Sequence, residues 1–209
     1  GLRTEIGAID INQGCSGFVY ALSLAKGMIE SQQVKNVLII TSETYSKYIN
    51  NKDKSVRTLF GDAACCTFIQ SKEANEELIN KVIHGTDGSG AEHLVVPHGA
   101  QRNPINESSF VEEMDTSKNL RSPSNLYMNG GAIYTFTLTK IPKVFNQILD
   151  SNDLTIDDLD LVIFHQANKF ILDAMQRKLK IPDEKMHRSY MEYGNTVSST
   201  IPIGIKIEQ

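Results

Sequence analysis

Three residues of types that take part in acyl-transfer chemistry stand at separate predicted turns of this 209-residue chain: Cys15, His165 and Asn195. Cys15 follows a strand-like apolar pattern at 6–11 and precedes apolar residues at helical spacing from 18 to 29. The free N–H groups and positive end of a helix favour the thiolate, which is the nucleophilic form of cysteine. The pattern therefore predicts an acyl-accepting cysteine at the N-terminus of a helix.

Each of the three residues also has a purely structural interpretation. A lone cysteine is usually a small buried hydrophobe. His165 ends a predicted buried strand at 160–164, and Asn195 stands between Gly194 and Thr196 in a tight turn, where asparagine often serves the backbone alone. Taken together, however, a cysteine, a histidine and an asparagine at element ends can converge on one pocket. There histidine and asparagine donors stabilise negative charge on a thioester oxygen.

The composition is that of an ordinary globular protein, with 40% hydrophobic and 22% charged residues. The net charge of −4 gives no general attraction to nucleic acid, and no apolar run reaches the roughly 18 residues of a membrane span. The three cysteines fit a reducing compartment, and Cys65 and Cys66 would point to opposite faces of one strand, so we expect no zinc site. Because the sequence does not begin with Met, we expect it to start inside a longer protein.

The order of predicted elements is mixed α/β. We expect strands at 6–11, 36–42, 61–70, 78–85 and 159–164, and helices at 16–30, from 129 onward, from 168 to about 180 and from 197 to 207. Pro142 should divide or kink the helical stretch that opens at 129. Residues 97–125 are polar and should run over the surface as a connector. Junctions between strand ends and helix starts are where α/β sheets place their chemistry.

Five short motifs occur in order along the chain. They lie at 12–18 (NQGCSGF), 59–62 (LFGD), 87–90 (DGSG), 164–171 (FHQANKFI) and 193–202 (YGNTVSSTIP). With these motifs the chain resembles the thiolase-fold condensing enzymes, and specifically the beta-ketoacyl-[acyl-carrier-protein] synthase III group, over nearly its whole length. The Gly-Asn-Thr motif at Asn195 is similar to that of the Cys-His-Asn subgroup, whereas the chain-elongating synthases carry a second histidine there.

The resemblance implies an α/β fold in which two similar halves stack as a five-layer α/β/α/β/α sandwich. Residues 1–96 would form the C-terminal part of the first half with the nucleophile, 97–128 a connector, and 129–209 most of the second half. Members of the group are longer, so the resemblance also implies a fold that is incomplete at both ends. The acyl-pocket region and a closing glycine-rich loop would be missing, and we expect that this chain by itself does not turn over.

The same resemblance implies a mechanism. Cys15 would attack an acyl-CoA thioester and hold the acyl group, with its own backbone N–H as half of an oxyanion hole. His165 and Asn195 would stabilise the enolate formed when malonyl-carrier protein loses carbon dioxide, and this carbanion would attack the acyl-cysteine. No cofactor beyond these substrates, no metal, no nucleic acid and no membrane is implied, and the expected assembly is a cytoplasmic homodimer.

A coenzyme A channel follows from the same resemblance. Its lining residues are expected to be Asn168, Gly130, Gly131 and Tyr134. Lys54 stands where many members have an arginine beside the adenine, and a lysine keeps the charge but loses planar stacking. Arg57 either compensates for that loss or is a solvated surface charge.

A basic cluster follows His165 in the sequence. Its members are Lys169, Arg177, Lys178 and Lys180. A cluster of this kind is often only a solvated helix face. The resemblance implies instead that it docks the acidic carrier protein, with complementary charge raising the encounter rate more than the affinity.

Two other functions stay open from the sequence. Relatives with this fold move an acyl group to an alcohol, amine or other acceptor without decarboxylation, and Cys15, His165 and Asn195 do not exclude that reaction. A non-catalytic scaffold subunit has no use for a nucleophile, so the three residues argue against it. An acyl adduct on Cys15 distinguishes an enzyme from a scaffold, and carbon dioxide release with malonyl-carrier protein distinguishes condensation from simple transfer.

Overall fold

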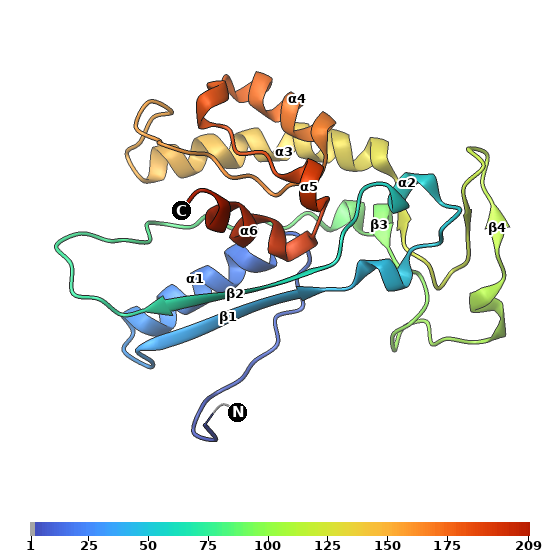
Figure 1. Ribbon diagram of the computed structural model, residues 1–209, viewed down its shortest axis with the longest axis horizontal. Helices are drawn as coiled ribbons and strands as arrows, with labels where there is room; N and C mark the ends of the chain where they lie inside the picture. The colour runs from blue at the N-terminus through green and yellow to red at the C-terminus, as the bar shows by residue number, and fades with distance from the viewer. Residues whose placement is uncertain (1–2) are drawn as a thin grey trace.

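The computed structural model describes residues 3–209, which form helices and antiparallel strand pairs (Figure 1). The helices are α1 (Gly17–Glu30), α2 (Lys54–Arg57), α3 (Gly130–Ser151), α4 (Lys169–Leu179), α5 (Tyr190–Tyr193) and α6 (Thr200–Ile207). The strands are β1 (Asn36–Glu43), β2 (Ala63–Gln70), β3 (Leu94–Val95), β4 (Glu113–Met114), β5 (Leu120–Arg121) and β6 (Tyr127–Met128). Short 3₁₀ turns lie at Tyr45–Tyr48, Gly88–His93, Glu107–Phe110, Asp183–Lys185 and Val197–Ser199.

Strands β1 and β2 lie where the sequence predicts strands, and they pair in one long antiparallel ribbon. Ile40 pairs with Cys66 in the register of the ribbon, and alternate residues face opposite sides. Cys65 is half-buried and Cys66 is exposed, so the two thiols do point to opposite faces. One face of β1 is open, since Leu38 is exposed.

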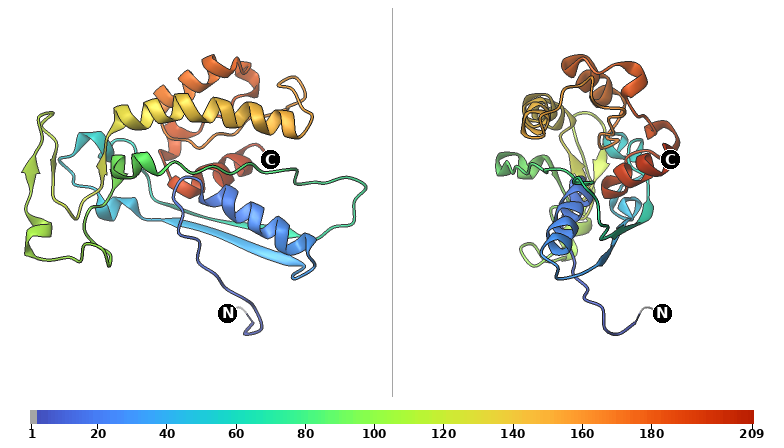
Figure 2. Two further views of the ribbon diagram at one scale, coloured as in Figure 1. Left: turned by 180° about the vertical axis from the view of Figure 1, so that it is seen from behind. Right: turned by 90° about the vertical axis from the view of Figure 1, so that its left-hand side faces the viewer.

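Helices α1 and α6 cover the inner face of this ribbon (Figures 1 and 2). Phe18 and Ala25 of α1 pack with Ile39 of β1 in a small buried cluster. Helix α6 contacts β2. Because α1 begins just after Cys15 and α6 just after Asn195, this packing brings two of the sequence-predicted residues toward the same part of the molecule.

Helices α3 and α4 pack together on the other side of α6 and form the larger core (Figure 1). Its buried members are Phe145, Leu149, Val162, Ile171, Leu172, Met175, Leu179, Ile181 and Met186. Leu172 and Met175 on the buried face of α4 are 0% and 1% exposed. Burial of one such side chain contributes about 1.5–3 kcal/mol, so this face fixes α4 against α3.

Of the two expected effects of Pro142, division of the helix is wrong, because α3 runs without a break from Gly130 to Ser151. A kink at Pro142 stays a prediction. A proline cannot donate to the carbonyl four residues earlier, which here belongs to Leu138. Lys178 of α4 supplies the missing donor, with Nζ 2.7 Å from Leu138 O. The neighbouring helix therefore satisfies the carbonyl that the proline leaves free.

Three of the predicted strands do not form as strands. Residues 6–11 and 78–85 are irregular, and from the stretch at 159–164 only Val162 makes a bridge, with Met186. A strand is stabilised by hydrogen bonds to a neighbour, and within residues 3–209 these stretches have no regular partner. The apolar patterns of these stretches are present, but a strand also needs a neighbouring strand to which its backbone can form hydrogen bonds.

A buried ion pair joins the first part of the chain to the connector. Arg121 Nε lies 2.7 Å from Asp53 Oδ2, and its Nη2 lies 2.5 Å from Asp115 Oδ2. The Asp53 side chain is fully buried and also accepts from Ser55 N–H at the start of α2. One carboxylate thus both starts α2 and fixes it to β5.

Replacing Asp53 by Asn should lower the free energy of unfolding by about 3 kcal/mol, because it leaves the Arg121 charge without its buried partner. Asparagine keeps a side-chain oxygen that accepts from Ser55 N–H, so the loss of stability measures the ion pair. Chemical denaturation measures the effect. Lys140→Gln, which breaks an exposed pair with Asp87, is the control and should change stability little. An equally small effect of Asp53→Asn would contradict this role.

Candidate active site

The turn around Asn195 is bound directly to the backbone of residues 59–61. Asn195 N–H donates to Leu59 O at 2.8 Å, and Gly61 N–H donates to Asn195 O at 3.0 Å. The approach is so close that a Cβ on Gly194 would lie 2.9 Å from Leu59 O, and Gly194 has φ of +67°. Only glycine fits this position without strain, which explains the Gly-Asn-Thr motif in physical terms.

The Asn195 side chain is fixed by the backbone that follows it. Its Oδ1 accepts from Val197 N–H at 2.9 Å, and the residue is 7% exposed. Val197 is fully buried and has φ of +55°, a left-handed conformation that is costly for a β-branched residue. Such strain persists only where the surroundings over-determine the backbone.

Three consecutive hydroxyl groups then bind this turn to other elements. Ser198 Oγ donates to Glu43 Oε1 at 2.6 Å, and Ser199 Oγ lies 2.8 Å from Thr41 Oγ1. Thr200 Oγ1 lies 2.7 Å from His165 Nδ1. The segment 194–200, which we call the anchor segment, thus contacts β1 on one side and His165 on the other.

The loop that carries Cys15 also rests on the anchor segment. A methyl group on Gly14 would lie 3.6 Å from Val197 Cγ1, and one on Gly17 would lie 3.3 Å from the Cβ of Ser198. Cys15 itself is two residues before the first residue of α1. The structure therefore brings Cys15, His165 and Asn195 to one short segment, although 150 residues separate the first two in the sequence.

The backbone N–H at the start of α1 favours the Cys15 thiolate, as expected, but burial opposes it more strongly. Burial raises the pKa of the thiol to about 11, and the Glu43 carboxylate raises it further, whereas the backbone N–H of Cys15 lowers it. Desolvation of the charged form outweighs the helix terminus here. At neutral pH, Cys15 is a thiol that needs a base before it can attack.

His165 is neutral at physiological pH. Burial lowers the pKa of its imidazole to about 4, and a backbone hydrogen bond with Val197 opposes this in part. A neutral imidazole keeps one nitrogen free to accept a proton. The burial that keeps the cysteine protonated therefore also keeps this histidine available as a base.

The residues expected in the coenzyme A channel lie at helix starts. Asn168 caps α4, with Oδ1 3.0 Å from Ile171 N. Gly130 and Gly131 open α3, and Tyr134 in its second turn is 38% exposed. Helix α2, with Lys54 and Arg57 exposed on it, lies near β6, which leads into α3 (Figure 1). Arg57 Nη1 donates to Asn51 O, whereas the exposed Lys54 side chain makes no hydrogen bond within residues 3–209.

The expected docking residues have different surroundings. Arg177 and Lys180 are exposed near the end of α4. Lys169 is 63% exposed and pairs with Asp173 one turn later. Lys178 is also exposed, but its ammonium group binds Leu138 O. Two of the four cations are therefore already engaged within the chain.

Some residues of the site could not be identified from the sequence. The fold alone brings three more residues to the site, namely Glu43, Thr41 and Thr200. The only feature of the sequence that could have indicated any of them is the run of hydroxyl residues after Asn195.

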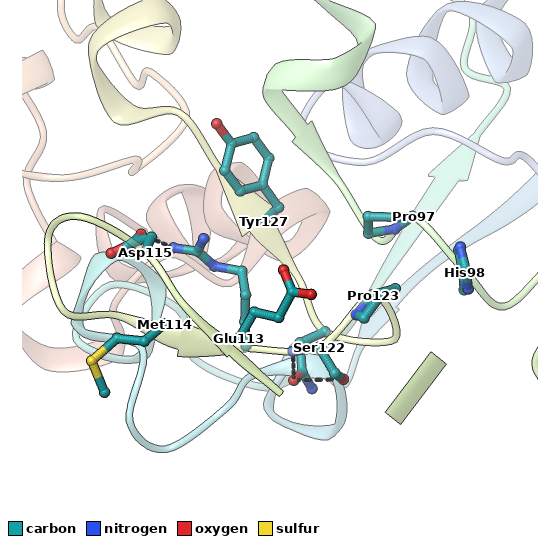
Figure 3. Close-up of a pocket in the computed structure, with 10 residues that line it drawn as sticks. Pro97, His98, Glu113, Met114, Asp115, Ser122, Pro123 and Tyr127 are labelled. Carbon is teal, nitrogen blue, oxygen red and sulfur yellow. Dashed lines mark hydrogen bonds and ion pairs between the residues drawn. The ribbon is translucent and has the colours of Figure 1, made fainter. Parts of the chain in front are cut away.

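A hollow of about 350 Å³ lies elsewhere, in the connector. Figure 3 shows its lining, where Asp115 is bonded to Arg121. None of the predicted catalytic residues lines it.

No helix in the described part of the chain is long and apolar enough to cross a membrane. Among residues 3–209 no group of three or more His, Cys, Asp or Glu side chains is arranged to hold a metal ion.

Sequence comparisons identify relatives of this chain. A model of 3-oxoacyl-[acyl-carrier-protein] synthase III matches residues 9–88, and a model of the C-terminal part of that enzyme matches 149–207. The beta-ketoacyl-[acyl-carrier-protein] synthase III of Clostridium perfringens is 38% identical over 199 residues, which are 95% of this chain and 58% of the relative. That of Caldanaerobacter subterraneus subsp. tengcongensis is 33% identical over 198 residues, or 95% and 57% of the two chains.

Solved structures agree. A 2.1 Å crystal structure of a 3-oxoacyl-(acyl-carrier-protein) synthase III has a TM-score of 0.96 at 43% identity, over 99% of this chain and 61% of that one. The 3-oxoacyl-(acyl-carrier protein) synthase of Burkholderia xenovorans LB400 has a TM-score of 0.85 at 34% identity, over 99% and 57%. The chain spans less than two thirds of the length of these relatives. With its thiolase-like α/β fold, it belongs to the 3-oxoacyl-[acyl-carrier-protein] synthase III family.

Proposed function

We propose that the complete protein containing this chain is a 3-oxoacyl-[acyl-carrier-protein] synthase III. It would transfer an acyl group from acyl-CoA to Cys15 and then condense that group with malonyl-carrier protein. The observation that carries the proposal is the anchor segment, which contains Asn195, bonds His165 through Thr200 and supports the Cys15 loop. Relatives at 33–38% identity bear the name of this activity.

The first step is transfer of the acyl group. The Cys15 sulfur attacks the thioester carbon while His165 takes the thiol proton, and the bond to the sulfur of coenzyme A then breaks. The proton passes from His165 to the leaving sulfur, so that coenzyme A departs as a thiol. A base is needed because the Cys15 pKa of about 11 leaves little thiolate at neutral pH.

The second step is condensation. Loss of carbon dioxide from the malonyl group leaves an enolate, whose carbon attacks the acyl-cysteine and releases the Cys15 sulfur. A buried amide donor stabilises the enolate oxygen in a site of low polarity. Asn195 has such an amide, because its Oδ1 is already engaged by Val197 N–H while its Nδ2 makes no hydrogen bond within residues 3–209.

The carrier protein is the second substrate that we propose. Exposed Arg177 and Lys180 at the end of α4 offer positive charge to its acidic surface, and such charges act mainly on the rate of encounter. The homodimer and the cytoplasmic location stay predictions from the family resemblance.

Incubation of the complete protein with a series of acyl-CoA thioesters should give an acyl adduct detectable by intact mass. Cys15→Ala should abolish the adduct, whereas Cys66→Ala, at the exposed cysteine of β2, should retain it. Addition of malonyl-carrier protein should then release carbon dioxide and a ketoacyl product. Absence of any adduct would indicate a scaffold, and an adduct that passes to another acceptor without carbon dioxide would indicate an acyltransferase; either result contradicts the proposal.

Alkylation of Cys15 by iodoacetamide should accelerate with rising pH up to about 11, since the thiolate is the reactive form. Glu43→Gln removes the negative charge that disfavours the thiolate and keeps the acceptor for Ser198, so it should lower the Cys15 pKa and raise the rate at a fixed pH. The gain should be below about tenfold, the equivalent of one pKa unit.

Peptide mass spectrometry separates Cys15 from the other two cysteines in this alkylation assay. Glu30→Gln, at the far end of α1, is the matched control and should not change the rate at Cys15. A reaction that already reaches its plateau near neutral pH, or a Glu43→Gln variant with an unchanged pH midpoint, would contradict the electrostatic account of the site.

A further inference from the structure

The two most exposed large apolar side chains among residues 3–209 lie close to the candidate site. Phe170 in the first turn of α4 is 78% exposed, and Met191 in α5 is 82% exposed. Phe170 follows His165 by five residues, and Met191 precedes Asn195 by four. Five residues span at most about 18 Å, so neither side chain is far from the proposed catalytic groups.

Helix α5 is bonded to the residues that lead into α4 (Figure 1). The backbone N–H of Ser189, just before α5, donates to Oε1 of the buried Gln166 at 2.8 Å. Arg188 adds a second connection, because its guanidinium group donates to Gln176 Oε1 in α4. The backbones that carry Phe170 and Met191 therefore form one unit, and we call these two exposed side chains the apolar rim.

The surface of α4 beside the apolar rim is positively charged, although the chain as a whole has a net charge of −4. Residues 169–180 contain four cations and one acid, Asp173. The Asp173 carboxylate lies 2.5 Å from Lys169 Nζ, so it is already paired. The exposed Arg177 follows Phe170 by two helical turns, which is about 10 Å along the same face. One face of α4 thus presents an exposed aromatic ring and an exposed cation.

An exposed aromatic side chain beside an exposed cation fits a partner with an acidic and partly apolar surface. In protein interfaces a few buried aromatic anchors supply most of the binding energy, whereas charges at the edge act mainly on the rate of encounter. We propose that Phe170 is the apolar anchor for the malonyl-carrier protein, with Arg177 attracting the acidic surface of that protein. The inference rests on the proposed function, in which the carrier protein must dock close to Asn195.

Direct binding of fluorescently labelled malonyl-carrier protein to the complete protein tests the anchor. Phe170→Ser should raise the Kd about tenfold, as is typical when an interface anchor is truncated. The rate at which acyl-CoA modifies Cys15 should stay unchanged, because that step does not use the carrier protein. Phe110→Ser is the matched control, since Phe110 is a 62% exposed phenylalanine of the connector, and it should leave both measurements unchanged.

Ionic strength separates the anchor from the charges around it. Arg177→Gln should raise the Kd at low salt, and this effect should disappear at about 1 M salt, where charges are screened beyond about 3 Å. The effect of Phe170→Ser should persist at 1 M salt, because burial of an apolar ring is not screened. A Phe170→Ser effect that disappears together with that of Arg177→Gln would contradict the role of the ring.

An unchanged Kd for Phe170→Ser, or an equal effect of Phe110→Ser, would overturn the inference. Slower modification of Cys15 by acyl-CoA in Phe170→Ser would place the ring against coenzyme A instead. A lower melting temperature of that variant would show that another segment of the complete protein, or a second copy, covers the ring, and either result also overturns the inference. Binding is measured without turnover, so a protein that forms no acyl adduct contradicts the proposed function and leaves the docking test readable.

Discussion

The whole site depends on the close contact between the anchor segment and the backbone of residues 59–61. Asn195 exchanges hydrogen bonds with Leu59 and Gly61, and a Cβ on Gly61 would lie only 2.4 Å from Tyr193 O. Two backbone segments packed this closely cannot move independently of each other. The hydroxyl groups of residues 198–200 are therefore held at fixed positions, where they bind β1 and His165.

This constraint couples packing to chemistry. Burial at the anchor segment raises the pKa of Cys15 and lowers that of His165, so both groups are neutral together at physiological pH. The sequence argument considered only how the helix terminus favours the thiolate, whereas the burial that opposes it exists only in the folded chain.

Local patterns predicted those elements that depend mainly on their own residues. The spacing of apolar residues correctly predicts α1, α4, β1 and β2. Asn168 caps α4. The effect of Pro142 was not predictable locally, because Lys178 of another helix donates to the carbonyl of Leu138 that the proline leaves free. The types of Cys15, His165 and Asn195 were visible in the sequence. Thr200 and Glu43 were not, since their roles exist only through contacts between distant segments.

The most direct test of this account is amide hydrogen exchange within and beside the anchor segment. The amides of Gly61, Asn195 and Val197, which make the three bonds of the turn, should exchange as slowly as that of Leu172 in the core of α4. Exchange of these amides as fast as that of the exposed, irregular stretch at 71–87 would show that the segment opens freely, and would contradict the claim that it holds the site together.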